Sequence, residues 1–444
     1  MDSLEEALKN LVSHGIENEY IELPQINLDR VVISNSEVHS RFSEWQDAPE
    51  EAFYYVDEAF VKFKRSAQKE VNYLVKEFEC RKSADQYSRS TFAKTGVLDT
   101  TKLHTYKFNE DLFKKVSVIP DGKNHGLIFI LDWSGSMGDV MEDTLKQLYN
   151  LIWFCKKVSI PFDVYAFTNE YPWKDADHNP RPACYEKREG VLCVPEWFSM
   201  LHLFTHKTNA KTLEIQMRNI YRCGYYFSHY CGYGVPIGLQ LSGTPLNEAL
   251  VTLNTIIPKF KKENKLQKVQ CVVLTDGEGA GIKFHKTVQR HWENEPYIGI
   301  RSLGSHCFLR DRKTGRTYNC GENWWEITDN ILELLKGRFT DTNFIGIRVL
   351  EPRDANSFIR RYCGYVGPLT ENTMATWRKT KSFVIKTSGY QSYFALSANA
   401  LSRDSEFEVG EGATKTQIKS AFVKSLRSKK MNKKILSEFI DLVA

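Results

Sequence analysis

Three short oxygen-bearing side chains occur at alternate positions directly after an apolar run near residue 130. They are Asp132, Ser134 and Ser136, and they follow the apolar residues 126–131. Carboxylate and hydroxyl oxygens are hard donors, which suit Mg²⁺ or another oxygen-seeking dication such as Mn²⁺ or Ca²⁺. Three such oxygens would hold a dication weakly, so further ligands are expected from elsewhere in the chain.

Two further oxygen donors lie where a folded chain can bring them to the first three. Thr244 precedes an expected helix at 246–253, and Asp276 follows the apolar run 269–274. Ligands of open α/β sheets bind at the carboxyl ends of the strands, so these side chains are expected to converge there. The pattern therefore predicts a dication site formed by Asp132, Ser134, Ser136, Thr244 and Asp276.

Two other interpretations of these residues remain open. A Ser- and Gly-rich turn with helix-capping side chains would have the same sequence without binding a metal. Asp132 and Asp276 would also suit a general acid and base, but the serines between them favour a metal site. The chain has no Gly-x-x-x-x-Gly-Lys-Ser/Thr segment, so it is not expected to hydrolyse ATP itself.

Apolar runs that alternate with helical spacing predict the sheet that would carry this site. Strand-like runs lie at 126–131, 162–167, 269–274 and 344–350, and a helix is expected over 141–158. The first run is apolar throughout, as in a strand that is covered on both faces. Strands that alternate with helices predict an α/β fold with a doubly wound, mostly parallel sheet.

The same pattern divides the chain into three parts. They are a mainly helical N-terminal region over 1–120, the sheet domain over 121–365 and a C-terminal α/β segment over 366–444. The sheet domain carries large insertions at about 168–241 and 277–342. A helix is expected near 211–221 in the first insertion, and a hairpin is expected around the Lys-Thr-Gly turn within 307–318 of the second.

Composition and charge narrow the class of protein. The 444 residues carry 60 Lys and Arg against 55 Asp and Glu, a formal net charge of +5 that does not indicate nucleic acid. No run of about 18 uncharged apolar residues occurs, and the acidic N-terminus lacks the apolar segment of a secretory signal. A cytoplasmic protein is therefore expected. Residues 415–434 are basic without any acid, and they predict either a solvated helix face or a contact surface for a partner.

The ten cysteines are expected to be reduced thiols, and Cys155 and Cys271 lie in apolar runs that indicate core positions. A structural zinc site in the first insertion is a weaker alternative, because no Cys-x-x-Cys pair occurs there. Its candidate ligands are Cys184, Cys193, Cys223, Cys231, His178, His202, His206 and His229. His202 and His206 are four residues apart, but no Glu follows the first of them, so they do not match the zinc-peptidase pattern.

The five oxygen donors together resemble the metal-ion-dependent adhesion site of von Willebrand factor A domains. That pattern is Asp-x-Ser-x-Ser followed by a Thr and then an Asp, each on a separate loop above the sheet. The resemblance covers about residues 121–365 and implies a Mg²⁺ that is touched by the two serines and the threonine. The two aspartates would act through water, and a carboxylate from a partner protein would complete the octahedron.

A further resemblance is to the CobT-type subunits of cobaltochelatases and to their relatives in tailed bacteriophages. It rests on Thr95-Gly-Val-Leu-Asp99, on Gly243-Thr-Pro-Leu-Asn-Glu-Ala-Leu250 and on Leu274-Thr-Asp-Gly-Glu278. Such subunits act with an AAA+ ATPase of the MoxR or CobS type. The long acidic linker that is typical of chelatase subunits is absent from this sequence.

These resemblances imply an adaptor that binds a dication and a client protein's Asp or Glu and works beside an AAA+ ATPase. No intrinsic catalytic activity is expected. Two alternatives stay open, namely a subunit of a chelatase-like enzyme that inserts a metal into a tetrapyrrole, and a virion structural or assembly protein. If the chain is encoded by a phage, the host cytoplasm or the virion would be its location.

Overall fold

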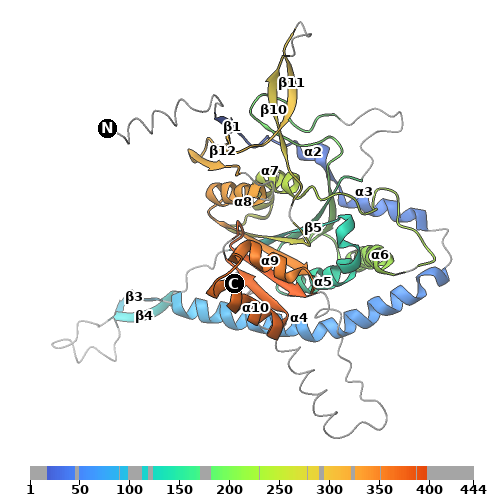
Figure 1. Cartoon of the computed structure of the whole chain (residues 1–444). Coiled ribbons are helices and arrows are strands. Elements are labelled where there is room, and N and C mark those ends of the chain that lie inside the picture. Colours follow the sequence, from blue (N-terminus) through green and yellow to red (C-terminus); the bar gives the residue numbers. More distant parts are fainter. Residues whose placement is uncertain are drawn as a thin grey trace.

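An eight-stranded sheet forms the centre of the protein (Figure 1). The computed structural model describes residues 18–45, 50–89, 91–98, 113–118, 124–170, 182–229, 231–277, 279–289, 295–321, 326–350, 352–386 and 388–397. The strands lie in the order β15 (Ser382–Ile385), β16 (Ser392–Ser397), β14 (Thr342–Leu350), β9 (Lys268–Thr275), β5 (His125–Asp132), β6 (Phe162–Thr168), β8 (Ser199–Thr205) and β2 (Val32–Ile33).

Most neighbours in this sheet run parallel. Strand β5 pairs in parallel with β6 on one side and with β9 on the other. The pairs β9–β14, β14–β16 and β2–β8 are also parallel, whereas β6–β8 and β15–β16 are antiparallel. The sequence prediction of an α/β fold with a mostly parallel sheet is therefore confirmed. From β8 to β16 the connections reverse direction between β5 and β9, as in a doubly wound fold.

Helices cover both faces of the sheet. Successive residues of a strand face opposite sides, so Leu127 and Phe129 join one apolar cluster and Ile128 and Ile130 join another. Helices α5 (Met141–Lys157) and α6 (Ala210–Ser228) lie on the first face, and α7 (Leu246–Asn264) and α8 (Glu326–Arg338) lie on the second (Figure 1). All five residues from Leu127 to Leu131 are fully buried, which explains why this run is apolar throughout.

The long helix α4 (Tyr54–Arg89) runs beneath the sheet and packs across α5 and α6 (Figure 1). The ring of Phe60 lies 5.3 Å from that of Tyr221, and the ring of Phe78 lies 5.5 Å from that of Phe154. Near the start of this helix, Asp57 forms a 2.6 Å ion pair with Arg222 of α6. The N-terminal helix thus shares a core with the sheet.

Two smaller sheets lie beyond the second face. In one of them, β1 (Glu19–Ile21) pairs in parallel with β12 (Cys307–Asp311), and β12 pairs antiparallel with β13 (Arg316–Asn319). The β12–β13 pair is the hairpin predicted within 307–318, and Gly315 adopts the positive φ of +71° in its turn. In the other, β10 (Lys283–Val288) joins β11 (Tyr297–Ser302) and β7 (Leu192–Cys193).

The range 168–241, expected as an insertion, contributes to the central domain itself. It supplies β8 to the sheet and α6 to the first face, and α6 includes the helix that was expected near 211–221. Strand β15 matches the strand-like residues 381–387, whereas the basic segment 415–434 lies outside the described residues. The remaining helices and strands are α2 (Leu28–Val31), α3 (Asn35–Ser40), α9 (Ala355–Cys363), α10 (Pro368–Thr380), β3 (Thr91–Leu98) and β4 (Phe113–Val118), together with the 3-10 helices η1 (Arg41–Trp45), η2 (Glu50–Phe53) and η4 (Gly135–Val140).

Within the described part of the chain, every helix is too short or too polar to cross a membrane.

Candidate metal centre

The predicted oxygen donors lie at the point where the sheet connections reverse direction. Asp132 is the last residue of β5 and Thr275 is the last residue of β9, and the two strands are direct parallel neighbours. Asp276 follows β9 immediately. Helices leave the two strands toward opposite faces, so the chain leaves room for a ligand between these carboxyl ends.

Hydrogen bonds link Ser134, Ser136 and Asp276, and another links Asp132 to Thr275, the residue before Asp276. The hydroxyls of Ser134 and Ser136 lie 3.1 Å apart, and Ser136 donates to Oδ1 of Asp276 over 3.0 Å. Thr275 donates from its hydroxyl to Oδ2 of Asp132 over 2.7 Å, and the same hydroxyl accepts the N–H of Gly277. The loops after β5 and β9 are therefore in direct contact.

Thr244 lies on a third loop that is tied to both of the others. Gly135 donates its N–H to the carbonyl of Ser242 over 2.7 Å, and Ser134 forms a parallel bridge with Ser242. The carbonyl of Thr244 accepts the N–H of Ala280 over 3.2 Å, which holds it beside the segment that follows β9. The three loops that carry the predicted residues are therefore in contact with one another.

The surroundings of Asp132 disfavour the charged form of its side chain. Its side chain is fully buried, and Oδ1 has no donor with hydrogen-bond geometry, although Ser134 lies close enough to favour the charged form. Burial and the neighbouring carboxylate of Asp276 raise the pKa of Asp132 to about 7, against smaller opposing effects from Thr275 and Ser134. A buried carboxylate in this position is stabilised by a nearby cation.

A cleft of about 580 Å³ opens beside these residues. Ser136, Asp276, Asp139 and Arg353 line part of it, together with Asp354. Arg353 and Asp354 come after β14, the next parallel strand, so the argument from strand ends that selected Asp276 would also have found them. Thr275 is a further residue that the sequence analysis missed, although it is adjacent to Asp276.

The cysteines and histidines of the first insertion do not gather into one cluster. Cys184 packs in the apolar cluster on the second face, whereas Cys223 packs in the cluster on the first face, so the sheet separates them. A zinc ion shared by all four insertion cysteines is thereby excluded, and His178 lies outside the described residues. Cys155 and Cys271 are fully buried, as the apolar runs predicted.

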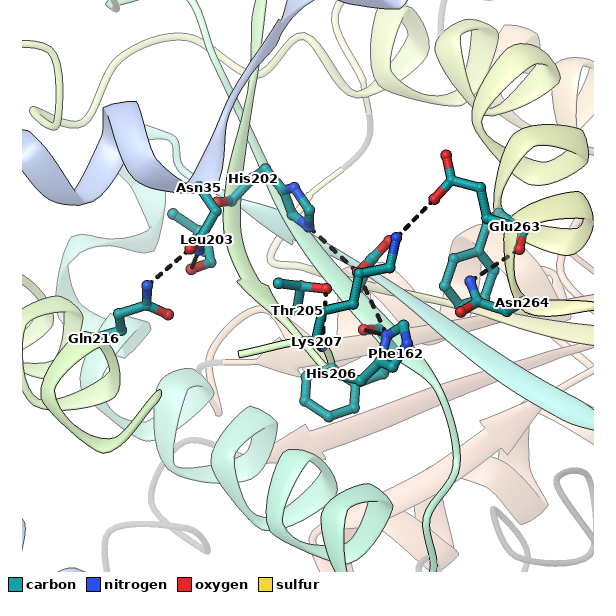
Figure 2. A network of polar contacts seen from close by, with 12 residues as sticks. Asn35, Phe162, His202, Leu203, Thr205, His206, Lys207, Gln216, Glu263 and Asn264 are labelled. Carbon is teal, nitrogen blue, oxygen red and sulfur yellow. Dashed lines mark hydrogen bonds and ion pairs between the residues drawn. The ribbon is translucent and has the colours of Figure 1, made fainter. Parts of the chain in front are cut away.

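His202 and His206 belong to a separate polar network near the amino end of β6, whereas the predicted metal site lies at the carboxyl ends of the strands (Figure 2). His202 Nε2 lies 3.4 Å from Oδ1 of Asp163, and His206 Nδ1 lies 4.0 Å from the same oxygen. Lys207 forms a 2.9 Å ion pair with Glu263 of α7 in the same view. His202 lies within β8 and His206 directly follows it, so the two histidines are not on a helix as in a peptidase zinc site.

We expect His39, which lies beside this network, to make the protein sensitive to acid. Its Nε2–H donates to the carbonyl of Leu203 over 2.7 Å, while Nδ1 is buried without a partner. Burial lowers the pKa of His39 from 6.5 to about 4, and nearby His202 adds to this effect. Between pH 6.5 and 4 the unfolded chain then binds more protons, so stability falls as the pH falls, by about 3 kcal/mol.

A His39→Phe variant tests this origin of acid sensitivity. Phenylalanine preserves the ring packing against Phe42 and Phe204, and the Leu203 carbonyl still accepts from the Asn35 amide. Urea unfolding between pH 4 and 7 is expected to show a shallower loss of stability in the variant. An unchanged slope would place the acid sensitivity at other groups.

Comparisons with known proteins do not assign a family. No family model matches the sequence, and no curated protein matches it. Among solved structures, the pilus adhesin SpaC from Lactobacillus rhamnosus GG in its open conformation matches with 12% sequence identity and a TM-score of 0.27. The match covers 52% of this chain and 24% of the adhesin chain, and at this TM-score it carries no argument about fold or function.

Proposed function

We propose that this protein is an adaptor whose sheet domain is of the von Willebrand factor A type. Its metal-ion-dependent adhesion site would bind Mg²⁺, or Mn²⁺ or Ca²⁺, through Asp132, Ser134, Ser136, Thr244 and Asp276. The single observation that carries the proposal is the fully buried carboxylate of Asp132 at the reversal point of the sheet, beside the carboxylate of Asp276 and with no donor in hydrogen-bond geometry to Oδ1. The position of the predicted donors, at the carboxyl ends of neighbouring parallel strands of a doubly wound sheet, supports the same proposal.

The donor set fits a hard dication. Two carboxylates and three hydroxyls offer oxygen only, and no nitrogen or sulfur ligand belongs to the set. Mg²⁺ prefers six oxygen ligands and keeps several waters when the protein supplies few charges. Ser136 is exposed to the cleft, so a carboxylate from a partner protein can reach this side of the site.

The cleft suits capture of an acidic side chain better than catalysis. Asp139 and Asp354 at its wall would repel a free carboxylate, while a bound dication and Arg353 would attract one. Metal binding would therefore switch the charge of the cleft from repulsive to attractive for an Asp or Glu of a client. The AAA+ ATPase of MoxR or CobS type enters this proposal from the sequence resemblance.

Binding of Mg²⁺ is expected to depend on the hydroxyls. Ser136→Ala removes an exposed donor without opening a core cavity, so we expect affinity for Mg²⁺ to fall at least about tenfold with the fold intact. Isothermal titration with Mg²⁺ measures this, and Thr376→Ala on the exposed face of α10 is the matched control. Equal Mg²⁺ affinity in the two variants would show that Ser136 is not a ligand.

Capture of a partner is tested by purification from native cells with Mg²⁺ and then with EDTA. An AAA+ ATPase or an acidic client that is lost in EDTA, and lost again with Ser136→Ala, supports the adaptor. Capsid or tail proteins that stay bound in EDTA would contradict a metal-bridged contact. Insertion of a metal into a tetrapyrrole on adding an ATPase would instead favour the chelatase-like subunit.

A further inference from the structure

A second group of metal-ligating side chains lies where the first described strand meets the β12–β13 hairpin. Glu19 on β1 is the parallel register partner of Cys307 on β12, and the N–H of Glu19 donates to the carbonyl of His306 over 2.9 Å. This pairing holds a carboxylate, an imidazole and a thiol side by side. The three residues play no part in the oxygen site at the ends of β5 and β9.

The ligand atoms are close enough for one ion. An oxygen of Glu19, a nitrogen of His306 and Sγ of Cys307 all lie within 4.8 Å of one another, and His306 Nε2 is 3.7 Å from Oε1 of Glu19. Tetrahedral Zn²⁺ with ordinary bond lengths sets its ligands about 3.3–3.8 Å apart. A small inward movement of side chains therefore suffices to complete three of four positions.

The surroundings allow an ion to enter from one side. Cys307 is fully buried, whereas Glu19 and His306 are half-buried and reach water. The thiol already has a polar contact, because the N–H of Gly304 points to Sγ of Cys307 over 3.3 Å. Burial raises the pKa of the Cys307 thiol, and this contact opposes that effect by favouring the thiolate, which is the form that binds metals. A water molecule would supply the fourth ligand.

A positively charged lysine already lies beside this group of ligands. The ammonium of Lys286, on β10, forms an ion pair with Glu19. Glu19 and Lys286 are also the charges that act on Cys307 in this neighbourhood. A dication and the Lys286 ammonium compete for the same carboxylate, so removal of the ammonium must favour the metal.

We propose that Glu19, His306 and Cys307 form a site for a thiophilic dication such as Zn²⁺, which fastens β1 to the β12–β13 hairpin and displaces the Lys286 ammonium. The mixed oxygen, nitrogen and sulfur set is characteristic of Zn²⁺ and unsuited to Mg²⁺. The site goes beyond the proposed adaptor function and does not depend on it, because the two donor sets select different metals.

Co²⁺ titration of the metal-free full chain tests the site directly, because a thiolate bound to Co²⁺ gives a charge-transfer absorption band. The test uses Cys80→Ser as the background, since Cys80 is an exposed thiol. We expect one Co²⁺ per chain with this band, displacement by Zn²⁺, and no displacement by a large excess of Mg²⁺. Cys307→Ser is expected to abolish the band, whereas Cys363→Ser leaves it unchanged.

Two half-buried positions keep the test decisive if Cys307→Ser fails to fold. His306→Gln is expected to weaken Co²⁺ binding at least about tenfold. Lys286→Ala is expected to strengthen it about tenfold, because a competing positive charge is lost. A band that survives in both Cys307→Ser and His306→Gln overturns the assignment, as does Lys286→Ala binding that is weaker than in the parent.

Discussion

Asp132→Asn is expected to make the metal-free protein more stable and at the same time to abolish its response to Mg²⁺. The native pKa of Asp132, about 7, lies above the value of 3.8 for an exposed Asp. The folded state therefore binds more protons between these values, and stability falls as the pH rises through this window. At pH 8 the full loss, up to about 4 kcal/mol, is present for Asp and absent for Asn.

Urea unfolding in EDTA at pH 8 measures this gain, and the gap should narrow as the pH is lowered toward 4. The amide oxygen of Asn still accepts the hydroxyl of Thr275, so the local fold is kept. Ser136→Ala is the matched comparison, because it removes an exposed metal donor and should change metal-free stability by less than about 0.5 kcal/mol. If Asp132→Asn is less stable than the parent in EDTA, the buried charge is compensated in another way.

Arg338→Leu is expected to destabilise the protein by about 3 kcal/mol. Asp311 on β12 is fully buried, and Arg338 of α8 binds both of its carboxylate oxygens. Burial alone would raise the pKa of Asp311, but hydrogen bonds from Arg338 and from the N–H of Lys313 lower it. Loss of the guanidinium would leave a buried carboxylate with too few donors, and it would free Asn254 Oδ1 of its 2.6 Å contact.

The double variant Arg338→Leu with Asp311→Asn separates charge from packing. We expect it to recover part of the lost stability, because the stranded charge is gone. Lys207→Ala, which breaks an exposed ion pair with Glu263, should cost less than about 1 kcal/mol in the same urea titration. Equal losses for Arg338→Leu and Lys207→Ala would show that the buried pair carries no special weight.

The central strands could be predicted from the sequence because their signals are local. Strand β5 is apolar throughout, and parallel strands of such a sheet bring Asp132 and Asp276 to one edge. Strand β8 was missed because residues 199–205 form neither a continuous apolar run nor a strict polar–apolar alternation, and they lie inside a Cys- and His-rich range. The position of β8 depends on antiparallel pairing with β6, which no spacing within β8 reveals.

Side chains that meet across long sequence separations were the least predictable. Cys184 and Cys223 are near in sequence but lie on opposite faces of the sheet, whereas Glu19 and Cys307 are distant in sequence but paired. Proximity along the chain was therefore a poor guide to shared metal ligands. The adjacent His306 and Cys307 were the only local trace of the second cluster, and the dipeptide alone has no predictive value.

The pairing of β1 with β12 also has a consequence during synthesis on the ribosome. Glu19 cannot meet its register partner Cys307 until nearly 290 more residues have been made. At roughly 5–20 residues per second, this delay is about 15–60 s. Over that time β1 has an unpaired edge that other strands can join. Among the described strand pairs, β1 and β12 are the farthest apart in sequence, so β1 waits longest for its partner, and chains that terminate before β12 would leave it available to aggregation or to chaperones.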